Sequence, residues 1–121
     1  MRKLKKRGVR ILPGGDYGFA WTKHGTNAKD LEYFVKYLGM TPMEALISAT
    51  KYGGQIMMQP HELGQIKEGY LADMLLVDGD PLANISVLQD QTRILAVMKD
   101  GKFYKEPVMR SERSVYSLSA A

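Results

Sequence analysis

The hydrophobic pattern of this chain changes its period once, near residue 64, and this change limits the folds open to it. Before that point apolar residues recur at helical spacing. Four of them form one stripe: Leu31, Phe34, Val35 and Leu38. After it, short apolar runs separated by turn residues are typical of strands. We therefore expect one helical layer over about residues 28–58 and a small antiparallel sheet over about residues 66–105.

Polar residues and glycines predict where the helices begin and end. Asn27 is expected to cap the N-terminus of the first helix, and Gly39 its C-terminus. A second helix is predicted to begin with a capping box that has proline at the first helical position. Its residues are Thr41, Pro42 and Glu44. Gly53-Gly54 is expected to loosen or end this second helix, because glycine is a poor helix former.

Three strands are predicted after the helices and one before them. Residues 74–77 form an apolar run bounded by aspartates, which predicts a buried strand. Residues 94–99 and 102–105 are expected to pair as a hairpin, because Asp100-Gly101 tolerates positive φ. Residues 8–12 are rich in β-branched side chains and are followed by a Pro-Gly-Gly turn, which predicts the leading strand.

The length and composition exclude several classes of protein. With 121 residues the chain is too short for a complete (β/α)₈ barrel, which takes about 250. It has no cysteine, which excludes disulfides, thiol nucleophiles and cysteine-based zinc sites. No apolar run approaches the roughly 18 residues of a membrane helix, so we expect no membrane partner. The lack of cysteine does not fix the compartment, and a cytoplasmic location is the expectation. Residues 107–121 are polar and serine-rich, which predicts a flexible tail.

The basic residues gather at the N-terminus. Residues 1–10 hold six of the 17 Lys and Arg residues and no acid, whereas the remainder carries a net charge of −2. Such a cluster can bind phosphate backbones. No aromatic residue interleaves it to stack on bases, so a solvated surface is the favoured interpretation and nucleic-acid binding a distant alternative.

Asp16 is the first candidate for chemistry. It follows the strand predicted at residues 8–12 and two glycines, and catalytic residues of barrels gather at the carboxyl ends of strands. A carboxylate there can bind a metal or act as a general base, whereas the alternative is an ordinary turn aspartate. His24 and His61 lie too far apart in sequence to form a metal motif with it, since catalytic zinc usually takes three protein ligands. For both histidines the alternative is a loop or surface role.

Three segments resemble the C-terminal part of a metal-dependent amidohydrolase, in the branch of imidazolonepropionase-like and Xaa-Pro dipeptidase-like proteins. GVRILPGGDYG, residues 8–18, resembles the last barrel strand with its terminal aspartate, and residues 24–54 resemble the helical segment that follows. GQIKEGYLAD and VDGDPL, within residues 63–90, resemble the return into the small β-sandwich, which residues 97–105 continue. The resemblance covers about four-fifths of the chain.

This resemblance implies an α/β fold followed by β, incomplete as a single chain. Residues 1–62 would be the last strand and helices of an amidohydrolase (β/α)₈ barrel, and residues 63–106 part of the small β-sandwich. Asp16 would be a metal ligand and the catalytic residue that takes a proton from the attacking water, and His24 would lie near the substrate. The implied cofactor is zinc or another divalent metal. The implied substrate of the full-length parent is a small amide or dipeptide.

The remaining ligands of the family, an HxH pair and further histidines, would all precede Gly8 in the family's order. We therefore expect the isolated chain to be inactive and its partner to be the missing N-terminal barrel portion. Unpaired strand edges and an apolar face also predict a homo-oligomer. The alternative function is a stand-alone oligomeric binding or assembly module derived from an amidohydrolase tail.

Overall fold

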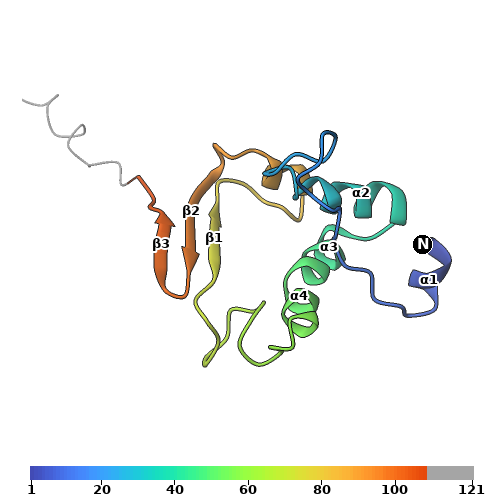
Figure 1. The fold of residues 1–121 in the computed structure, drawn as a ribbon, viewed down its shortest axis with the longest axis horizontal. Coiled ribbons are helices and arrows are strands. Elements are labelled where there is room, and N and C mark those ends of the chain that lie inside the picture. Colours follow the sequence, from blue (N-terminus) through green and yellow to red (C-terminus); the bar gives the residue numbers. More distant parts are fainter. Residues whose placement is uncertain (109–121) are drawn as a thin grey trace, which may run out of the picture.

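The computed structural model describes residues 1–108, which form a helical part followed by a three-stranded sheet (Figure 1). The helices are α1 (Arg2–Lys6), α2 (Lys29–Leu38), α3 (Pro42–Ala49), α4 (Lys51–Ile56) and a 3₁₀ helix, η1 (Ile85–Gln89). The strands are β1 (Met74–Val77), β2 (Ile94–Lys99) and β3 (Lys102–Lys105). Most of the predicted tail, residues 109–121, lies outside the described residues. Within residues 1–108 no helix has the length and apolarity needed to cross a membrane.

The C-cap of α2 and the N-cap of α3 follow the sequence pattern. Gly39 ends α2 in the left-handed conformation, with φ of 66°. The capping box of α3 is complete, because Glu44 N donates to Thr41 Oγ1 at 3.2 Å and Thr41 N donates to Glu44 Oε2 at 2.8 Å. The start of α2 differs from the prediction, since Ala28 and not Asn27 is the N-cap and its side chain makes no capping bond.

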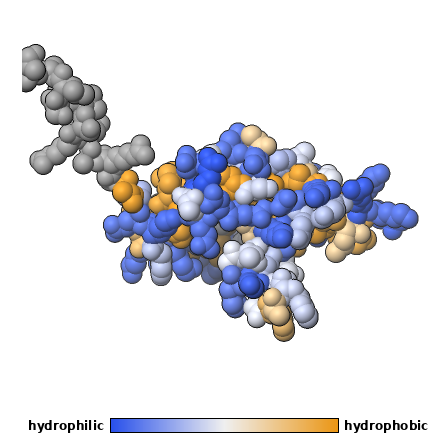
Figure 2. Space-filling view, turned by 90° about the horizontal axis from the view of Figure 1, so that it is seen from above, coloured by the Kyte–Doolittle hydropathy of each residue, from blue (hydrophilic) through white to orange (hydrophobic). Residues whose placement is uncertain are grey.

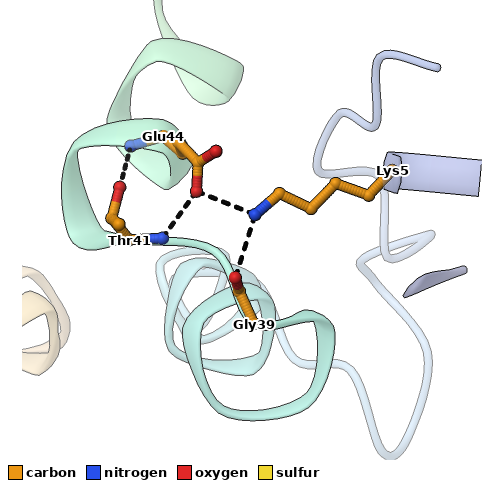
Figure 3. Close-up of polar contacts among 4 residues, drawn as sticks. All are labelled: Lys5, Gly39, Thr41 and Glu44. Carbon is orange, nitrogen blue, oxygen red and sulfur yellow. Dashed lines mark hydrogen bonds and ion pairs between the residues drawn. The ribbon is translucent and has the colours of Figure 1, made fainter. Parts of the chain in front are cut away.

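Glu44 also anchors the N-terminal helix (Figure 3). Lys5 Nζ lies 2.8 Å from Glu44 Oε2 and donates to the carbonyl oxygen of Gly39 at 2.9 Å. The same carboxylate therefore serves the capping box and an ion pair to α1. The hydrogen bond from Lys5, and next the backbone bond from Thr41, lower the pKa of Glu44 below its ordinary value of 4.5.

Replacing Glu44 with Gln is expected to lower the free energy of unfolding at neutral pH by about 1 kcal/mol, because the charge that serves both contacts is lost. The folded pKa is depressed, so this stabilisation is present above pH 4.5 and is lost as the pH falls through the folded pKa. Urea unfolding at neutral and acid pH measures both effects. Glu68→Gln is the control, since Glu68 is exposed and its side chain has no hydrogen-bond partner within residues 1–108. An equal loss in both variants would contradict the prediction.

Half of the basic cluster is engaged within the chain. Arg2 Nε donates to the carbonyl oxygen of Tyr37 at 2.7 Å, and Lys5 binds as described above. The Arg10 guanidinium bonds Gln55 and lies 5.2 Å from the ring centre of Tyr52. These contacts give three of the six cations a structural role.

The strand predicted at residues 8–12 is absent, so that prediction is wrong for this chain. No strand among the described residues pairs with this segment. Its backbone is satisfied in other ways: Val9 N donates to the carbonyl oxygen of Leu4 at 3.1 Å, and the buried Ser48 hydroxyl donates to that of Ile11. A strand needs a neighbouring strand to complete its hydrogen bonds, and residues 1–108 place none beside it. The described part is therefore helical and then β, without the leading strand of the expected α/β unit.

The helix break lies at Thr50 and not at the two glycines, so the expected break at Gly53-Gly54 is also wrong. Thr50 leaves regular helical geometry, with φ of −104° and ψ of −78°. Gly54 stays buried inside α4 because the backbone of Leu63 packs directly on it. A Cβ atom on Gly54 would lie 2.5 Å from the Leu63 carbonyl oxygen. This glycine therefore allows a close backbone approach and does not end the helix.

The predicted hairpin and strands are confirmed. β1, β2 and β3 form an antiparallel sheet in that order, and Asp100 and Gly101 turn the hairpin with φ of 48° and 72°. The expected burial of β1 is wrong, because Leu75 is 58% and Leu76 51% exposed. Within residues 1–108 no second layer covers this part of the sheet. Figure 2 shows apolar side chains at the surface among the polar ones.

The core lies between the helices and η1. Leu31, Ala45 and Ile85 are its buried centre, and half-buried side chains pack around them. These are Phe34, Val35, Leu46, Ala49 and Leu88. Asn84 caps η1 by accepting a hydrogen bond from Ser86 N at 3.1 Å. The segment between β1 and β2 therefore packs on α2 and α3.

Candidate active site

Asp16 lies in an exposed turn whose backbone is held by Thr22. Its φ of 46° is in the left-handed region, which is uncommon for a residue with a side chain. Thr22 Oγ1 donates to the carbonyl oxygen of Asp16 at 3.1 Å, and Gly18 N donates to that of Thr22 at 2.7 Å. The Asp16 carboxylate itself has no hydrogen-bond partner among the residues that the structure describes. The turn is thus bonded through its backbone and leaves the carboxylate available.

His24 belongs to the same loop as Asp16. Its ring lies against Gly18, since a Cβ atom placed on Gly18 would be 3.0 Å from His24 Nε2. Gly18 also has φ of 118°, so both its backbone angle and its neighbour favour glycine there. The structure therefore places Asp16 and His24 in one exposed loop, and their chemical roles remain predictions.

The described residues do not complete a metal site. Within residues 1–108 no three His, Asp or Glu side chains gather closely enough to hold a cation. Asp16 and His24 offer two side chains at most, whereas a catalytic zinc usually takes three protein ligands. This donor set alone does not fit a resident metal, so no hydrolytic step through a metal follows from this part of the chain.

A cavity of about 320 Å³ lies between the Asp16 turn and the start of α2. Tyr17 and Asp30 line it together with apolar residues. Tyr17 OH donates to the Asn27 carbonyl oxygen at 3.4 Å, and Gly14 N donates to Asp30 Oδ2 at 3.3 Å. Sequence reasoning missed these partners, and the acidic first turn of α2 is the one signal that pointed toward Asp30. The contacts bind the Asp16 turn to the helical layer.

The environment of Tyr17 predicts an unusual titration. Partial burial, and next the neighbouring Asp30 carboxylate, raise the pKa of Tyr17 from 10.0 to about 12. Because the folded pKa is raised, the stabilisation is present below pH 10 and is lost as the pH rises toward 12. Phenolate absorbance should show a late phase near pH 12 that Tyr17→Phe removes. Tyr104→Phe, in exposed β3, should retain it; a late phase that survives in Tyr17→Phe would contradict the assignment.

Comparison with known proteins gives one consistent result. The chain matches the sequence model of the Amidohydrolase family over residues 1–104. It is 36% identical to ochratoxinase of Aspergillus niger over 103 residues. The aligned segment covers 84% of this chain and 21% of that protein. It is 34% identical over 64 residues to imidazolonepropionase of Rubrobacter xylanophilus, covering 53% of this chain and 15% of that protein.

Solved structures agree with the sequence matches. A Xaa-Pro dipeptidase with methionine bound in its active site aligns with a TM-score of 0.77 and 40% identity, over 86% of this chain and 24% of that one. A putative prolidase from Bifidobacterium longum aligns with a TM-score of 0.80 and 28% identity, over 88% and 26%. The chain thus spans about a quarter of the length of these structures.

Proposed function

Because this chain belongs to the Amidohydrolase family, we propose that it supplies one part of a hydrolase that cleaves an amide or peptide-like C–N bond. The chemistry general to the family is metal-dependent. Asp16 is the proposed catalytic residue: its carboxylate contributes one metal ligand and can act as a general base toward water. The remaining ligands come from a barrel portion beyond the described residues. The observation that carries this proposal is the Asp16 carboxylate, which has no hydrogen-bond partner within residues 1–108 and stands on a backbone-bonded turn of the matched segment.

The proposed substrate is a small amide or dipeptide. The relatives support this class, because their names include a Xaa-Pro dipeptidase, a prolidase and an ochratoxinase. His24 is the proposed substrate-binding residue, since its ring lies against the turn that carries Asp16. Within residues 1–108 no three His, Asp or Glu side chains gather to hold a metal, so we propose that the 121-residue chain alone is inactive.

Reassembly with a truncated relative tests this function. The Xaa-Pro dipeptidase that is 40% identical to this chain would be produced without the segment that this chain matches, and the two pieces would be copurified with zinc. We expect dipeptide hydrolysis by the complex and none by this chain alone. Zinc-dependent hydrolysis by the chain alone would contradict its inactivity. A stable, zinc-loaded complex without activity would contradict the proposed role.

The open sheet edge supports a second candidate function, assembly of copies of this chain. β1 is an edge strand with an apolar sequence, and Asp73 and Asp78 flank it. Antiparallel pairing of β1 with its own copy would place these like charges opposite each other, which is unfavourable. Antiparallel pairing with β3 of another copy, in the register that sets residue 102 against residue 78, would instead place Lys102 opposite Asp78. We propose this β1–β3 contact for the oligomer, because an unprotected apolar edge is a template for strand addition.

A further inference from the structure

The loop that follows Asp16 displays two aromatic side chains to solvent. We call residues 17–22 the aromatic loop; it belongs to the blue segment at the top of Figure 1. Phe19 is 66% exposed and Trp21 91% exposed. Within residues 1–108 neither ring has an aromatic or cationic partner. Rings this exposed leave a large apolar area uncovered, and covering that area is favourable.

Backbone hydrogen bonds hold the aromatic loop in place beside Asp16. Thr22 N donates to the carbonyl oxygen of Phe19 at 3.2 Å, which closes a tight turn around Trp21. The Thr22 hydroxyl bonds the Asp16 carbonyl oxygen, so the turn is tied to the candidate catalytic residue itself. Rings on a bonded backbone lose less conformational freedom on binding than rings on a loose segment.

We propose that Phe19 and Trp21 form an aromatic surface that selects substrates with an aromatic or large aliphatic side chain next to the scissile C–N bond. This inference rests on the proposed function, because it needs the scissile bond at Asp16. The Thr22 hydroxyl bond to the Asp16 carbonyl oxygen holds the aromatic loop beside this aspartate, so a substrate whose scissile bond lies at Asp16 would meet these rings. An apolar side chain of the substrate would remove the surface of the rings from water. A glycine residue has no side chain to do so and would leave the rings exposed to solvent.

Trp21 is the only tryptophan of the chain, so tryptophan fluorescence reports on the aromatic loop provided that the truncated relative carries no tryptophan of its own. Tryptophans of the relative would therefore be replaced by phenylalanine. The probes are the dipeptides Phe-Pro and Gly-Pro, added to the reassembled complex after zinc removal so that no turnover consumes them. We expect Phe-Pro to shift the emission to the blue and to reduce acrylamide quenching, and Gly-Pro to do neither. The inference is overturned if both probes act alike, if neither acts, or if the barrel portion alone shields Trp21.

Kinetics of the zinc-loaded complex give a second readout. Trp21→Ala is expected to lower kcat/KM for Phe-Pro by about 10- to 100-fold and to change that for Gly-Pro by less than about twofold. Tyr104→Ala, an exposed aromatic of β3, is the matched control and should change neither. Equal losses on both dipeptides would overturn the selectivity. An inactive complex would instead contradict the proposed function, and the fluorescence of the zinc-free complex would then decide this inference alone.

Discussion

In the reassembled hydrolase, Asp16→Asn is expected to lower kcat for a dipeptide by at least about 10³-fold. Asparagine keeps the size of the side chain but cannot take a proton from water, and its neutral amide is a weaker metal ligand. It also tolerates the left-handed backbone at this position, so the turn should form unchanged. The measurement is steady-state hydrolysis together with zinc content of the purified complex.

Asp100→Asn is the matched control for this variant. Asp100 is likewise an exposed aspartate in the left-handed region, with φ of 48° against 46° for Asp16, but it lies in the β2–β3 turn. We expect this variant to retain kcat within about twofold, because the group does not approach the reacting bond. Activity of Asp16→Asn within about tenfold of the unsubstituted complex would remove Asp16 from the catalytic role.

The second large effect is expected at the open sheet edge. The chain alone should form oligomers at micromolar concentration, and Leu76→Lys should weaken this association by at least tenfold, because a charge on an edge strand opposes strand addition. Sedimentation velocity over a concentration series measures the effect. Since the proposed contact pairs Lys102 with Asp78, salt should also weaken it. Leu71→Lys, an exposed position outside the strands, is the control.

Two outcomes would contradict the assembly proposal. The first is that the unsubstituted chain sediments as a monomer at every concentration. The second is that Leu71→Lys disrupts association as strongly as Leu76→Lys. If the chain is a monomer, we expect the barrel portion of the reassembled enzyme to cover the exposed apolar residues of β1. The activity measurements on Asp16 do not depend on this outcome.

The features predicted correctly are those that depend on neighbours in the chain. The capping box of Thr41 and Glu44 closes within four residues, and the Asp100-Gly101 turn needs only two residues that tolerate positive φ. The stripe of α2 follows from the helical period, and Leu31, its first residue, is buried. Such features need no distant partner, which explains why a sequence pattern predicts them.

Three of the wrong predictions concern residues whose state depends on a distant segment. The pattern of residues 8–12 suits a strand, but pairing requires a second strand that residues 1–108 do not place there. The β1 side chains are apolar, yet burial requires a covering layer. Gly54 looked like a helix end, and only the close approach of Leu63 shows why glycine stands inside α4.

The candidate site divides in the same way. The amino-acid order alone determined that Asp16 follows a glycine-rich turn and that His24 lies eight residues later, and the family resemblance attached their roles. Only the tertiary structure decided that His24 packs on Gly18, that Asp30 lies beside Tyr17, and that Trp21 stands exposed near Asp16. The physical reason is that the position of a side chain depends on loop closure and packing between distant residues, whereas caps, turns and helical stripes depend on local backbone chemistry.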